Sequence, residues 1–434
     1  MAINELKNKR VLILGFGREG QDTLKFLRKI FPGKVIGVAD RKENGMLKAQ
    51  SEKSQFKAQN IKWRIGKSYL NGLKNYDVII KSPGVPVHLP EVEKAFKQGK
   101  ITSQTEIFFD NCPGKIIGIT GTKGKSTTTA LIYEILKAGG IKARLVGNIG
   151  KPVLNLLSSA TPKDVYVYEL SSHQLFNLKK SPHIAVFLNI YSEHLDYYRN
   201  FNEYARAKAN ITLHQTKDDY LIYNVNDKLI KEFARKSIAQ KIPITGKYYE
   251  LDRNAAKAVG KLFKIPQKTI SKAIKDFKGL PHRLELAGKF RGITFYNDSL
   301  ATIPEATIAA IDKLGNKVQT LFLGGYDRGI NFGELAKKVL KSKVKNIILF
   351  PTTGEKIWKA LRLASLAHRG QTSVKLPEPF FVDNMKDAVK LAYEHTDKGK
   401  IALLSCASPS FGLFKDYAER GDLFKKYAKE LSRQ

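Results

Sequence analysis

The sequence predicts an α/β protein whose sheets are mostly parallel. Short apolar runs of strand length alternate with amphipathic helical segments along its 434 residues, the pattern of βαβ units. Glycine-rich turns follow two of these strands, at 15–20 and 118–124, where a turn leading into a helix can receive phosphate groups. We expect three domains: a Rossmann-like N-terminal domain at 1–103, a central P-loop ATPase-type domain at 104–281, and a C-terminal Rossmann-like domain at 282–434.

The composition is that of a globular chain with a large excess of positive charge. Apolar residues make up 42% and charged residues 26%, as in ordinary soluble domains. Lys and Arg outnumber Asp and Glu by 75 to 40, which gives a formal net charge of +35. The lysines are spread along the whole chain, which favours a solvated basic surface over a nucleic-acid tract. A nucleotide-dependent nucleic-acid-binding protein stays open as an alternative.

Two further features bear on the compartment. Cys112 and Cys406 are the only cysteines, so the chain has neither a disulfide framework nor a cysteine zinc site. The N-terminus is polar, and no apolar run approaches the roughly twenty residues of a membrane span. We therefore expect a cytoplasmic protein that is not inserted in a membrane.

The first domain carries a dinucleotide-binding pattern. Gly15, Gly17 and Gly20 form G-x-G-x-x-G after the strand RVLIL, and Asp40 ends the next strand twenty residues later. A second βα unit begins at 76–86, where Ser82 follows the strand. An NAD enzyme would fit this pattern alone, but hydride transfer has no use for the triphosphate site that follows. A uridine diphosphate carrier in a Rossmann-like domain reconciles both signals.

The central domain begins with a P-loop arrangement. Ile116 to Ile119 read as a strand, the turn Gly118 to Gly124 follows, and Lys125 and Ser126 open a helix that extends over 128–138. Backbone N–H groups of such a turn surround phosphates, the lysine neutralises them, and the serine holds Mg²⁺. The glycines are offset from the strict G-x-x-x-x-G-K-[ST] pattern. We predict a nucleoside triphosphate site.

Other polar residues of this domain follow strands at the edge expected for Lys125. Glu169 ends the strand run 164–172, and His194 follows the run 183–190. A carboxylate there commonly assists Mg²⁺, whereas His194 is as consistent with a structural role as with a metal ligand. Strands are expected at 220–225 and 242–245, and the period becomes helical over 254–278 until Gly279-Leu280-Pro281 ends it.

The last domain again alternates strands and helices. Its strands are expected at 293–299, 319–325, 346–350 and 401–405, with a turn at 326–329 and a terminal helix that ends near Leu431. This order predicts a mostly parallel sheet whose loops gather at one edge.

The chain resembles the Mur ligases over nearly its whole length. The matching motifs stand in the family's order: GFGREG, VAD, SPGVP, GITGTKGKST, GNIG, ELSSHQL, LNIYSEHLDYY, YARAKANI, LPHRLE, NDSLAT, LGGYDRG and LLSCASPSFGLFKDYAERG. The offset glycines of the P-loop are the family's own form. The resemblance is strongest to the branch that adds D-glutamate to UDP-N-acetylmuramoyl-L-alanine.

The resemblance implies an ATP-dependent, amide-forming ligase of peptidoglycan synthesis that proceeds through an acyl phosphate. It implies two Mg²⁺ ions, the first on Ser126 and Glu169, the second on His194 and on Lys208 carrying a CO₂-derived carbamate. The implied catalytic residues are Lys125, Glu169, His194 and Lys208. The implied ATP-binding residues are Gly121, Thr122, Lys123, Gly124, Lys125, Ser126, Thr127, Asn254, Arg283 and Asp298.

The resemblance also assigns the other two substrates. The residues implied for the UDP substrate are Gly15, Gly17, Arg18, Glu19, Asp40, Ser82, Asn148, Ser171 and Gln174. Those implied for the incoming amino acid are Thr302, Arg328, Ser410 and Tyr417. We expect a monomer that binds no nucleic acid.

Four positions depart from the family's pattern. Lys123 replaces a common Asn and adds a cation beside the phosphates, while Leu300 replaces a Lys and removes one. Arg328 replaces a Lys, which keeps the charge and changes the donor geometry, and Leu251 replaces an Asn near adenine. Leu300 and Arg328 leave open a sibling ligase that adds a different amino acid, such as L-glutamate.

Overall fold

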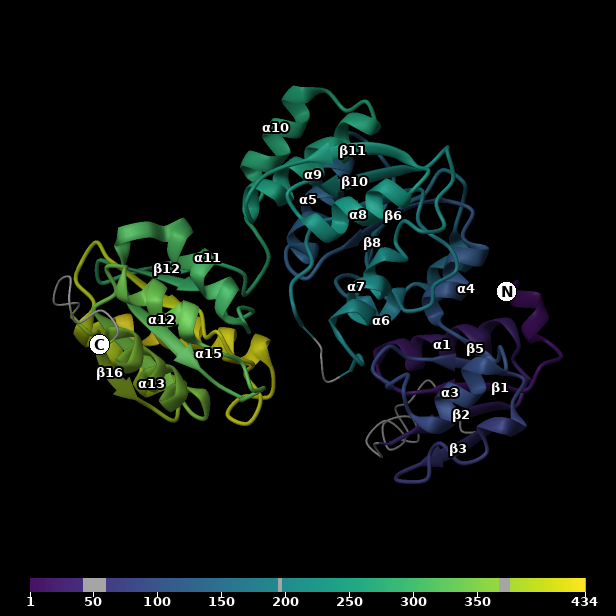
Figure 1. The fold of residues 1–434 in the computed structure, drawn as a ribbon, viewed down its shortest axis with the longest axis horizontal. Coiled ribbons are helices and arrows are strands. Elements are labelled where there is room, and N and C mark those ends of the chain that lie inside the picture. Colours follow the sequence, from purple (N-terminus) through teal and green to yellow (C-terminus); the bar gives the residue numbers. More distant parts are fainter. Residues whose placement is uncertain (42–59, 194–196, 367–374, 434) are drawn as a thin grey trace. The chain divides into compact units, whose positions relative to one another are not determined.

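The structure is a computed structural model that describes residues 1–41, 60–193, 197–366 and 375–433. The chain forms two compact units, Met1–Phe277 and Lys278–Gln434, and each is described by itself. The first unit contains two β-sheets and the second contains one (Figure 1). All three sheets are parallel apart from one antiparallel strand pair, which confirms the predicted fold class. The domain boundaries at 103 and 281 stay a prediction.

The first sheet has five parallel strands, in the order β3-β2-β1-β4-β5. Its strands are β1 (Val11–Leu14), β2 (Ile36–Asp40), β3 (Ile61–Ile65), β4 (Val78–Lys81) and β5 (Ile101–Thr102). Its helices are η1 (Ile3–Leu6), α1 (Arg18–Ile30), η2 (Leu73–Asn75), α3 (Pro90–Lys97) and α4 (Gln104–Asn111). The predicted G-x-G-x-x-G turn joins β1 to α1 at the carboxyl edge of this sheet.

The second sheet has six parallel strands, in the order β11-β10-β9-β6-β8-β7. The strands are β6 (Lys115–Thr120), β7 (Ala143–Gly147), β8 (Val165–Glu169), β9 (Ile184–Phe187), β10 (Tyr220–Asn224) and β11 (Gln240–Ile244). The helices are α5 (Lys125–Ala138), η3 (Leu154–Ser159), α6 (Ser172–Leu175), α7 (Phe201–Ala209), α8 (Lys228–Lys236), α9 (Tyr249–Leu262) and α10 (Gln267–Asp276). Strand β6 lies between β8 and β9, so the P-loop stands at the centre of the edge.

The helical segment expected over 254–278 is two helices. Helix α9 begins earlier, at Tyr249, and ends at Leu262, and α10 starts at Gln267. Lys264 adopts a positive φ of 55°, and Pro266 has no backbone N–H to continue a helical ladder. The break lets both helices pack on α5.

The sheet of the second unit has the order β12-β13-β17-β14-β15-β16, with β12 antiparallel to β13. The strands are β12 (Glu285–Phe290), β13 (Ile293–Asn297), β14 (Val318–Gly324), β15 (Asn346–Phe350), β16 (Glu378–Phe381) and β17 (Ile401–Leu404). The helices are α11 (Pro304–Leu314), η4 (Gly315–Lys317), α12 (Gly333–Leu340), α13 (Thr353–Leu366), α14 (Met385–His395), α15 (Tyr417–Glu430) and η5 (Leu431–Arg433).

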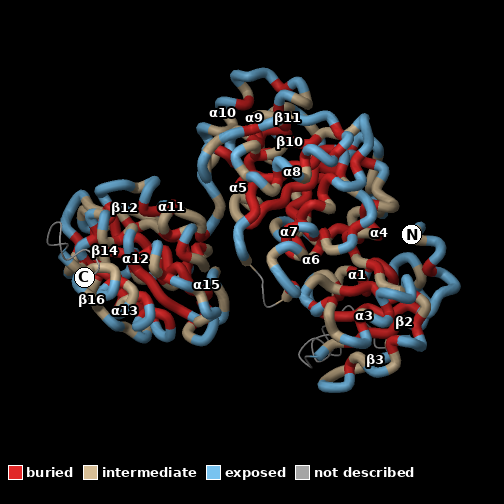
Figure 2. Tube along the Cα trace, in the orientation of Figure 1, coloured by how far each residue is buried: buried red, intermediate tan, exposed pale blue. Residues whose placement is uncertain are grey.

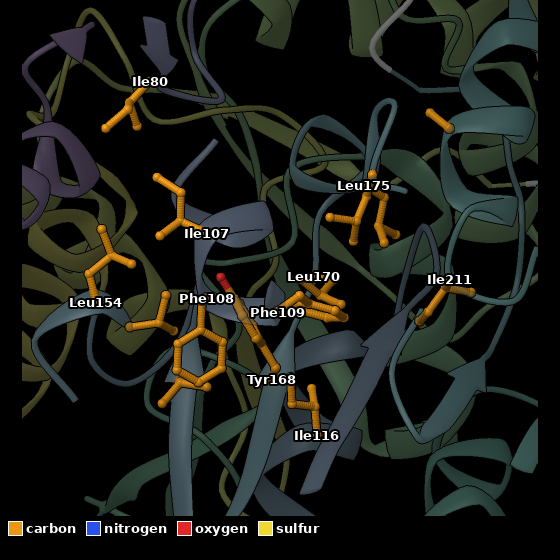
Figure 3. Close-up of a cluster of buried hydrophobic side chains, with 14 of the residues drawn as sticks. Ile80, Ile107, Phe108, Phe109, Ile116, Leu154, Tyr168, Leu170, Leu175 and Ile211 are labelled. Carbon is orange, nitrogen blue, oxygen red and sulfur yellow. The ribbon is translucent and has the colours of Figure 1, made fainter. Parts of the chain in front are cut away.

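Most central strands of the sheets consist of buried residues (Figure 2). One hydrophobic cluster contains residues of both sheets of the first unit, from Val11 and Ile80 to Tyr168 and Leu221. Figure 3 shows its centre, where Phe108 of α4 lies beside Tyr168 of β8, with ring centroids 5.9 Å apart in an edge contact. Since fully buried aromatic side chains contribute a few kcal/mol each, this cluster fixes the first sheet against the second. Across the described residues, no helix is long and apolar enough to span a membrane.

Candidate functional site

The P-loop turn connects β6 to α5 through two glycines with positive φ, 159° at Gly121 and 85° at Gly124. Gly124 is the N-cap of α5, and Lys125, Ser126 and Thr127 form the first turn of that helix. The Lys125 ammonium donates to the carbonyls of Gly121 and Thr122, both at 3.0 Å. The turn thus directs a helix N-terminus and a cation to the same point, the arrangement that binds phosphate.

A residue far along the chain also leaves no room for a side chain at position 124. A Cβ at this position would lie 2.3 Å from Oδ1 of Asp252 in α9. The same carboxylate oxygen accepts a hydrogen bond from the Thr128 hydroxyl at 2.9 Å. Helix α9 therefore packs so closely on the P-loop that no side chain fits there. Asn254, one of the residues predicted to bind ATP, lies on α9 and donates to the Thr245 carbonyl at 2.8 Å.

Lys208 on α7 is one of the most deeply buried charged side chains, with 2% of its surface exposed. Its ammonium donates to the Gly121 carbonyl at 2.9 Å and lies 4.9 Å from the centre of the Tyr204 ring. Burial lowers the pKa of Lys208 well below its ordinary value, and the nearby ammonium of Lys125 lowers this pKa further. The two predicted catalytic lysines thus share one carbonyl of the P-loop.

Glu169 stands at the end of β8, opposite Ile119 of β6 in the parallel register. It is 3% exposed, and its Oε2 atom makes no hydrogen bond within the described part of the chain. A buried carboxylate oxygen without a donor is costly unless another group satisfies it. Of the four predicted metal-binding residues, His194 lies outside the described residues. Nowhere in the described ranges do three or more His, Cys, Asp or Glu residues form a metal-binding group.

Lys123, which departs from the family's pattern, has specific hydrogen-bond partners. The Lys123 ammonium donates to Oε1 of Glu193 at 3.0 Å. The Lys123 N–H donates to the side-chain oxygen of Asn189 at 2.8 Å, and the side-chain amide of Asn189 donates to the Lys123 carbonyl at 3.0 Å. The cation expected beside the phosphates is therefore paired with a carboxylate on the segment after β9.

A cavity of about 620 Å³ opens at the carboxyl edge of the first sheet. Seven of the nine residues predicted for the UDP substrate line it: Gly15, Gly17, Arg18, Glu19, Asp40, Ser82 and Asn148. The cavity walls come from both sheets of the first unit, with Gly147 of β7 and Tyr168 of β8 among the lining residues from the second. Its volume is in the range of ordinary small-molecule sites. The structure brings these predicted residues together.

Hydrogen bonds hold the turn of this cavity in shape. The Ser82 hydroxyl donates to the Gly15 carbonyl at 2.8 Å, and Oδ2 of Asp40 accepts from the Phe16 N–H at 2.5 Å. Arg18 donates to the carbonyls of Asn148 and Gly150. The side chains of Ser82 and Asp40 thus support the backbone of the turn as well as line the cavity.

The two remaining residues predicted for the UDP substrate lie on α6. Ser171 caps this helix by accepting from the Gln174 N–H at 3.2 Å. The Gln174 amide donates to Oε1 of Glu19 at 2.7 Å. Burial raises the pKa of Glu19 to about 7, and the hydrogen bond from Gln174 opposes this shift.

Lys81 is a residue of this region that the sequence reasoning missed. It is 8% exposed at the end of β4, and its ammonium donates to the carbonyls of Ser82 and Val85 at 3.0 and 2.9 Å. Burial lowers the pKa of Lys81 to about 8, while the carboxylate of Glu19 opposes this shift. The available signal was a single lysine in the apolar strand DVIIK, directly before Ser82.

In the second unit, Asp298 follows β13 and is 5% exposed. Its carboxylate accepts from the Ser405 hydroxyl at 2.9 Å and from the Leu284 N–H at 3.0 Å. Burial raises the pKa of Asp298 to about 7, and the guanidinium of Arg283 partly offsets this shift. Asp298 therefore anchors the start of this unit to the end of β17.

The predicted amino-acid-binding residues follow three neighbouring strands of this unit: Thr302 after β13, Arg328 after β14, and Ser410 and Tyr417 after β17. The guanidinium carbon of Arg328 lies 5.9 Å from the centre of the Phe411 ring. Ser410 is 3% exposed and Tyr417 is 42% exposed. Strand order places these loops at one edge of the sheet.

Arg420 of α15, which sequence reasoning missed, holds these loops together. It is fully buried, and its guanidinium donates to the Ser299 hydroxyl and carbonyl at 3.0 and 2.7 Å and to the Ser408 carbonyl at 3.1 Å. Such fork-shaped donation is specific to arginine. Its place one helical turn before the buried Phe424 was the available signal.

Curated proteins similar to this chain cover it almost completely. The "UDP-N-acetylmuramoylalanine--D-glutamate ligase" of Acetivibrio thermocellus is 33% identical, with 98% of this chain and 97% of the relative covered. The protein of the same name from Thermoanaerobacter sp. is 34% identical, with 99% and 100% covered. That from Streptococcus agalactiae serotype III is 33% identical, with 97% of each covered.

Solved structures share the fold at lower identity. A UDP-N-acetylmuramate-alanine ligase MurC from Thermotoga maritima aligns with a TM-score of 0.59 and 16% identity, covering 98% of this chain and 100% of that one. A MurF ligase from Thermotoga maritima in complex with ADP aligns with a TM-score of 0.57 and 15% identity, covering 98% and 97%.

Three domain families match successive parts of the sequence. They are the Mur ligase MurD-like N-terminal domain at residues 9–102, the Mur ligase middle domain at 119–297, and the Mur ligase glutamate ligase domain at 282–407. Together with relatives of 33% and 34% identity over nearly the full length, these matches show that the chain belongs to the Mur ligase family.

Proposed function

We propose that the chain joins D-glutamate to UDP-N-acetylmuramoyl-L-alanine through an amide bond, with conversion of ATP to ADP and phosphate, in peptidoglycan precursor synthesis. The observation that carries this proposal is the cluster of Lys125, Lys208 and Glu169 around the P-loop, in a chain that is similar over 98% of its length to ligases named for that reaction. The 620 Å³ cavity of the first unit, which is lined by seven of the nine residues predicted for the UDP substrate, supports a separate site for the uridine nucleotide.

The residues around the P-loop fit a divalent cation. Oε2 of Glu169 is buried and has no donor among the described residues, and Ser126 stands in the first turn of α5. Hard cations such as Mg²⁺ take carboxylate and hydroxyl oxygens. Ser126 and Glu169 would hold one Mg²⁺, and His194 with a modified Lys208 a second. Bound Mg²⁺ would offset negative charge on phosphoryl oxygens.

Carbamylation of Lys208 is supported by its environment. An amine attacks CO₂ only as the free base, and burial together with the neighbouring Lys125 ammonium lowers the pKa of Lys208 well below its ordinary value. Addition of CO₂ to the neutral amine forms an N–C bond and releases one proton to solvent, which leaves an anionic carbamate. The neighbouring Lys125 ammonium, which disfavours a cation at Lys208, would then attract this anion.

The chemistry follows from the charge of the groups that react. A carboxylate is a poor acyl donor, so transfer of the ATP γ-phosphoryl group to the alanyl carboxylate would give an acyl phosphate and ADP. The free amine of glutamate would then attack the acyl carbon, form the amide, expel phosphate and lose a proton to solvent. Lys125 and the N–H groups of the turn would stabilise the charge on the transferred phosphoryl oxygens. No protein nucleophile is needed.

The other predicted residues complete the assignment. We assign the cavity lined by the Gly15–Gly20 turn, Ser82 and Asn148 to the UDP end of the substrate, and Ser171 and Gln174 to its reacting end. Asn254, Arg283 and Asp298 are assigned to ATP, and Thr302, Arg328, Ser410 and Tyr417 to the amino acid. We assign the chain to the cytoplasm, as a monomer with domains bounded at 103 and 281.

A sibling ligase with another amino acid is the second candidate. Arg328 is one of two residues that motivate it, because its guanidinium lies against Phe411 and presents a flat fork in place of a lysine point charge. Leu300, whose N–H donates to the His282 carbonyl at 3.0 Å, is the other, since it offers no charged side chain. Arg328 is itself one of the predicted amino-acid-binding residues, and Leu300 stands two residues before another of them, Thr302.

The test is incubation with ATP, Mg²⁺, UDP-N-acetylmuramoyl-L-alanine and a panel of amino acids that includes D- and L-glutamate. We expect phosphate release and a product of the corresponding mass with D-glutamate. Release with another amino acid would change the acceptor and keep the mechanism. Absence of phosphate release with every acceptor would refute the ligase function.

A further inference from the structure

The segment after β9, residues 189–193, is fastened to the P-loop through its backbone. The Thr122 N–H donates to the Asn189 carbonyl at 2.9 Å, and the Tyr191 N–H donates to the Thr122 hydroxyl at 2.9 Å. The Asn189 side chain, 7% exposed, clamps the N–H and carbonyl of Lys123. Hydrogen bonds therefore join the P-loop to this segment at residues 189 and 191.

The ion pair between Lys123 and Glu193 extends this attachment to the end of the segment. Its two atoms are 3.0 Å apart, and the side chains are 25% and 20% exposed. Lys125, two residues later, has different partners, because its ammonium donates to the carbonyls of the turn itself. Lys123 thus points to the neighbouring segment and Lys125 to the phosphate-binding turn.

We infer that Lys123 is a positioning residue, which fixes Glu193 and the segment before it, and that it is not a ligand of the ATP phosphates. This inference rests on the proposed function for the identity of the nucleotide. Glu193 directly precedes His194 in the sequence, the residue assigned to a second Mg²⁺. Loss of the ion pair would then weaken metal binding and turnover while ATP affinity stays the same.

The alternative is an inert ion pair, because ion pairs exposed to solvent commonly contribute very little. If Lys123 were instead a ligand of the ATP phosphates, its removal would lower the affinity for ATP. Loss of a hydrogen bond to a charged group weakens affinity by about tenfold or more. The positioning role, the inert ion pair and the phosphate ligand therefore predict different results for two quantities, the affinity for nucleotide and the affinity for metal.

The experiment uses the full chain with the substitutions Lys123→Met, Glu193→Gln, the double variant, and Lys123→Arg. Lys137→Met, which removes an exposed lysine at the other end of α5, is the matched control. Three quantities are measured: the Kd of a non-hydrolysable ATP analogue, the Kd of Mn²⁺ in the analogue complex by electron paramagnetic resonance, and kcat.

We expect an unchanged analogue Kd, within about twofold, in every variant. Lys123→Met and Glu193→Gln should each weaken Mn²⁺ binding and lower kcat by about tenfold, and the double variant should be no worse than either, the behaviour of a coupled pair. Lys123→Arg should keep wild-type values because it keeps the ion pair.

Two results would overturn the inference. A rise of about tenfold in the analogue Kd for Lys123→Met alone would make Lys123 a phosphate ligand, and unchanged values throughout would make the ion pair inert. Failure of the proposed function would look different, because the wild-type chain would then lack turnover while the two Kd values of the variants could still be compared.

Discussion

The first unit contains two glycine-rich turns that join a strand to a helix, and they differ in the charge around them. The turn at Gly15 opens onto a cavity of about 620 Å³ whose lining contains the carboxyl groups of Glu19 and Asp40 as well as Arg18. The nearby Lys81 ammonium donates to the carbonyls of Ser82 and Val85. The turn at Gly121 has the ammonium groups of Lys125 and Lys208 on its own carbonyl. The backbone of each turn favours an anion, whereas the neighbouring side chains decide how much negative charge it can carry.

This contrast agrees with the proposed ligands. A uridine diphosphate sugar carries two diester charges and would use backbone N–H groups and Arg18. ATP carries more charge and transfers a phosphoryl group, so it would need cations that act during the reaction. Four predictions separate the two turns by their chemistry.

The largest effect is expected for Lys125→Met. Removal of the cation from the P-loop should lower turnover by about 10³-fold, as for loss of a group that stabilises the transferred phosphoryl oxygens. Affinity for the uridine nucleotide should stay within about twofold, because that cavity does not include Lys125. Phosphate release and titration calorimetry measure the two effects. Turnover within tenfold of the wild type would contradict the assignment of the P-loop.

Lys208→Ala should lower turnover by about 10²-fold or more, because a group assigned to the proposed second Mg²⁺ is lost, and added bicarbonate should not restore it. The matched control is Arg206→Ala, which removes an exposed cation from the same helix and should leave turnover unchanged. Mass spectrometry of the intact wild-type chain at neutral pH should detect the added CO₂. Full activity of Lys208→Ala would rule out the carbamate.

Gly15→Ala and Gly124→Ala should each destabilise the first unit by about 1–3 kcal/mol, since φ is positive at both positions and no space is left for a Cβ atom. A Cβ at Gly15 would lie 2.9 Å from Cβ of Ser82, and one at Gly124 would lie 2.3 Å from Asp252. Gly33→Ala, with no atom within 4 Å of the new Cβ, is the control and should be nearly neutral. Thermal unfolding of the three variants provides the comparison, and equal midpoints would refute it.

The smallest effect concerns pH. Burial raises the pKa of Glu19 to about 7, so this carboxyl in the wall of the cavity is neutral below that pH and anionic above it. Affinity for a uridine diphosphate sugar, whose charge is constant over this range, should therefore fall by up to about tenfold from pH 6 to pH 8. Glu19→Gln should remove the part of this dependence that Glu19 causes and leave the part due to Lys81, whose pKa is about 8, while the exposed Glu5→Gln should keep all of it. A flat profile for the wild-type chain would disprove the role of Glu19.

Much of the fold could be predicted because its strands are continuous apolar runs such as VLIL and VYVYE. The strands that sequence reasoning missed are short or lie at sheet edges. β5 has two residues, and β12 and β16 contain no buried residue. An edge strand is half solvated, so its sequence lacks the apolar run that marks a central strand.

The candidate site was predictable where its chemistry is local in the sequence. The two glycine turns are local motifs, and the first gathers its predicted residues around one cavity. Lys81 and Arg420 were missed because a charged residue is by default assigned to solvent, and only the tertiary structure shows that each satisfies several buried carbonyls. The pairing of Lys123 with Glu193 joins residues 70 positions apart, a contact that no spacing rule contains.

The contact between Asp252 and the P-loop has a consequence for synthesis of the chain. Thr128 of α5 bonds to a carboxylate that leaves the ribosome 124 residues later. A nascent chain that has reached Lys208 already contains all four residues assigned to catalysis, yet it lacks the helix that packs on the P-loop. The P-loop therefore cannot reach its final form during translation until α9 has emerged and docked.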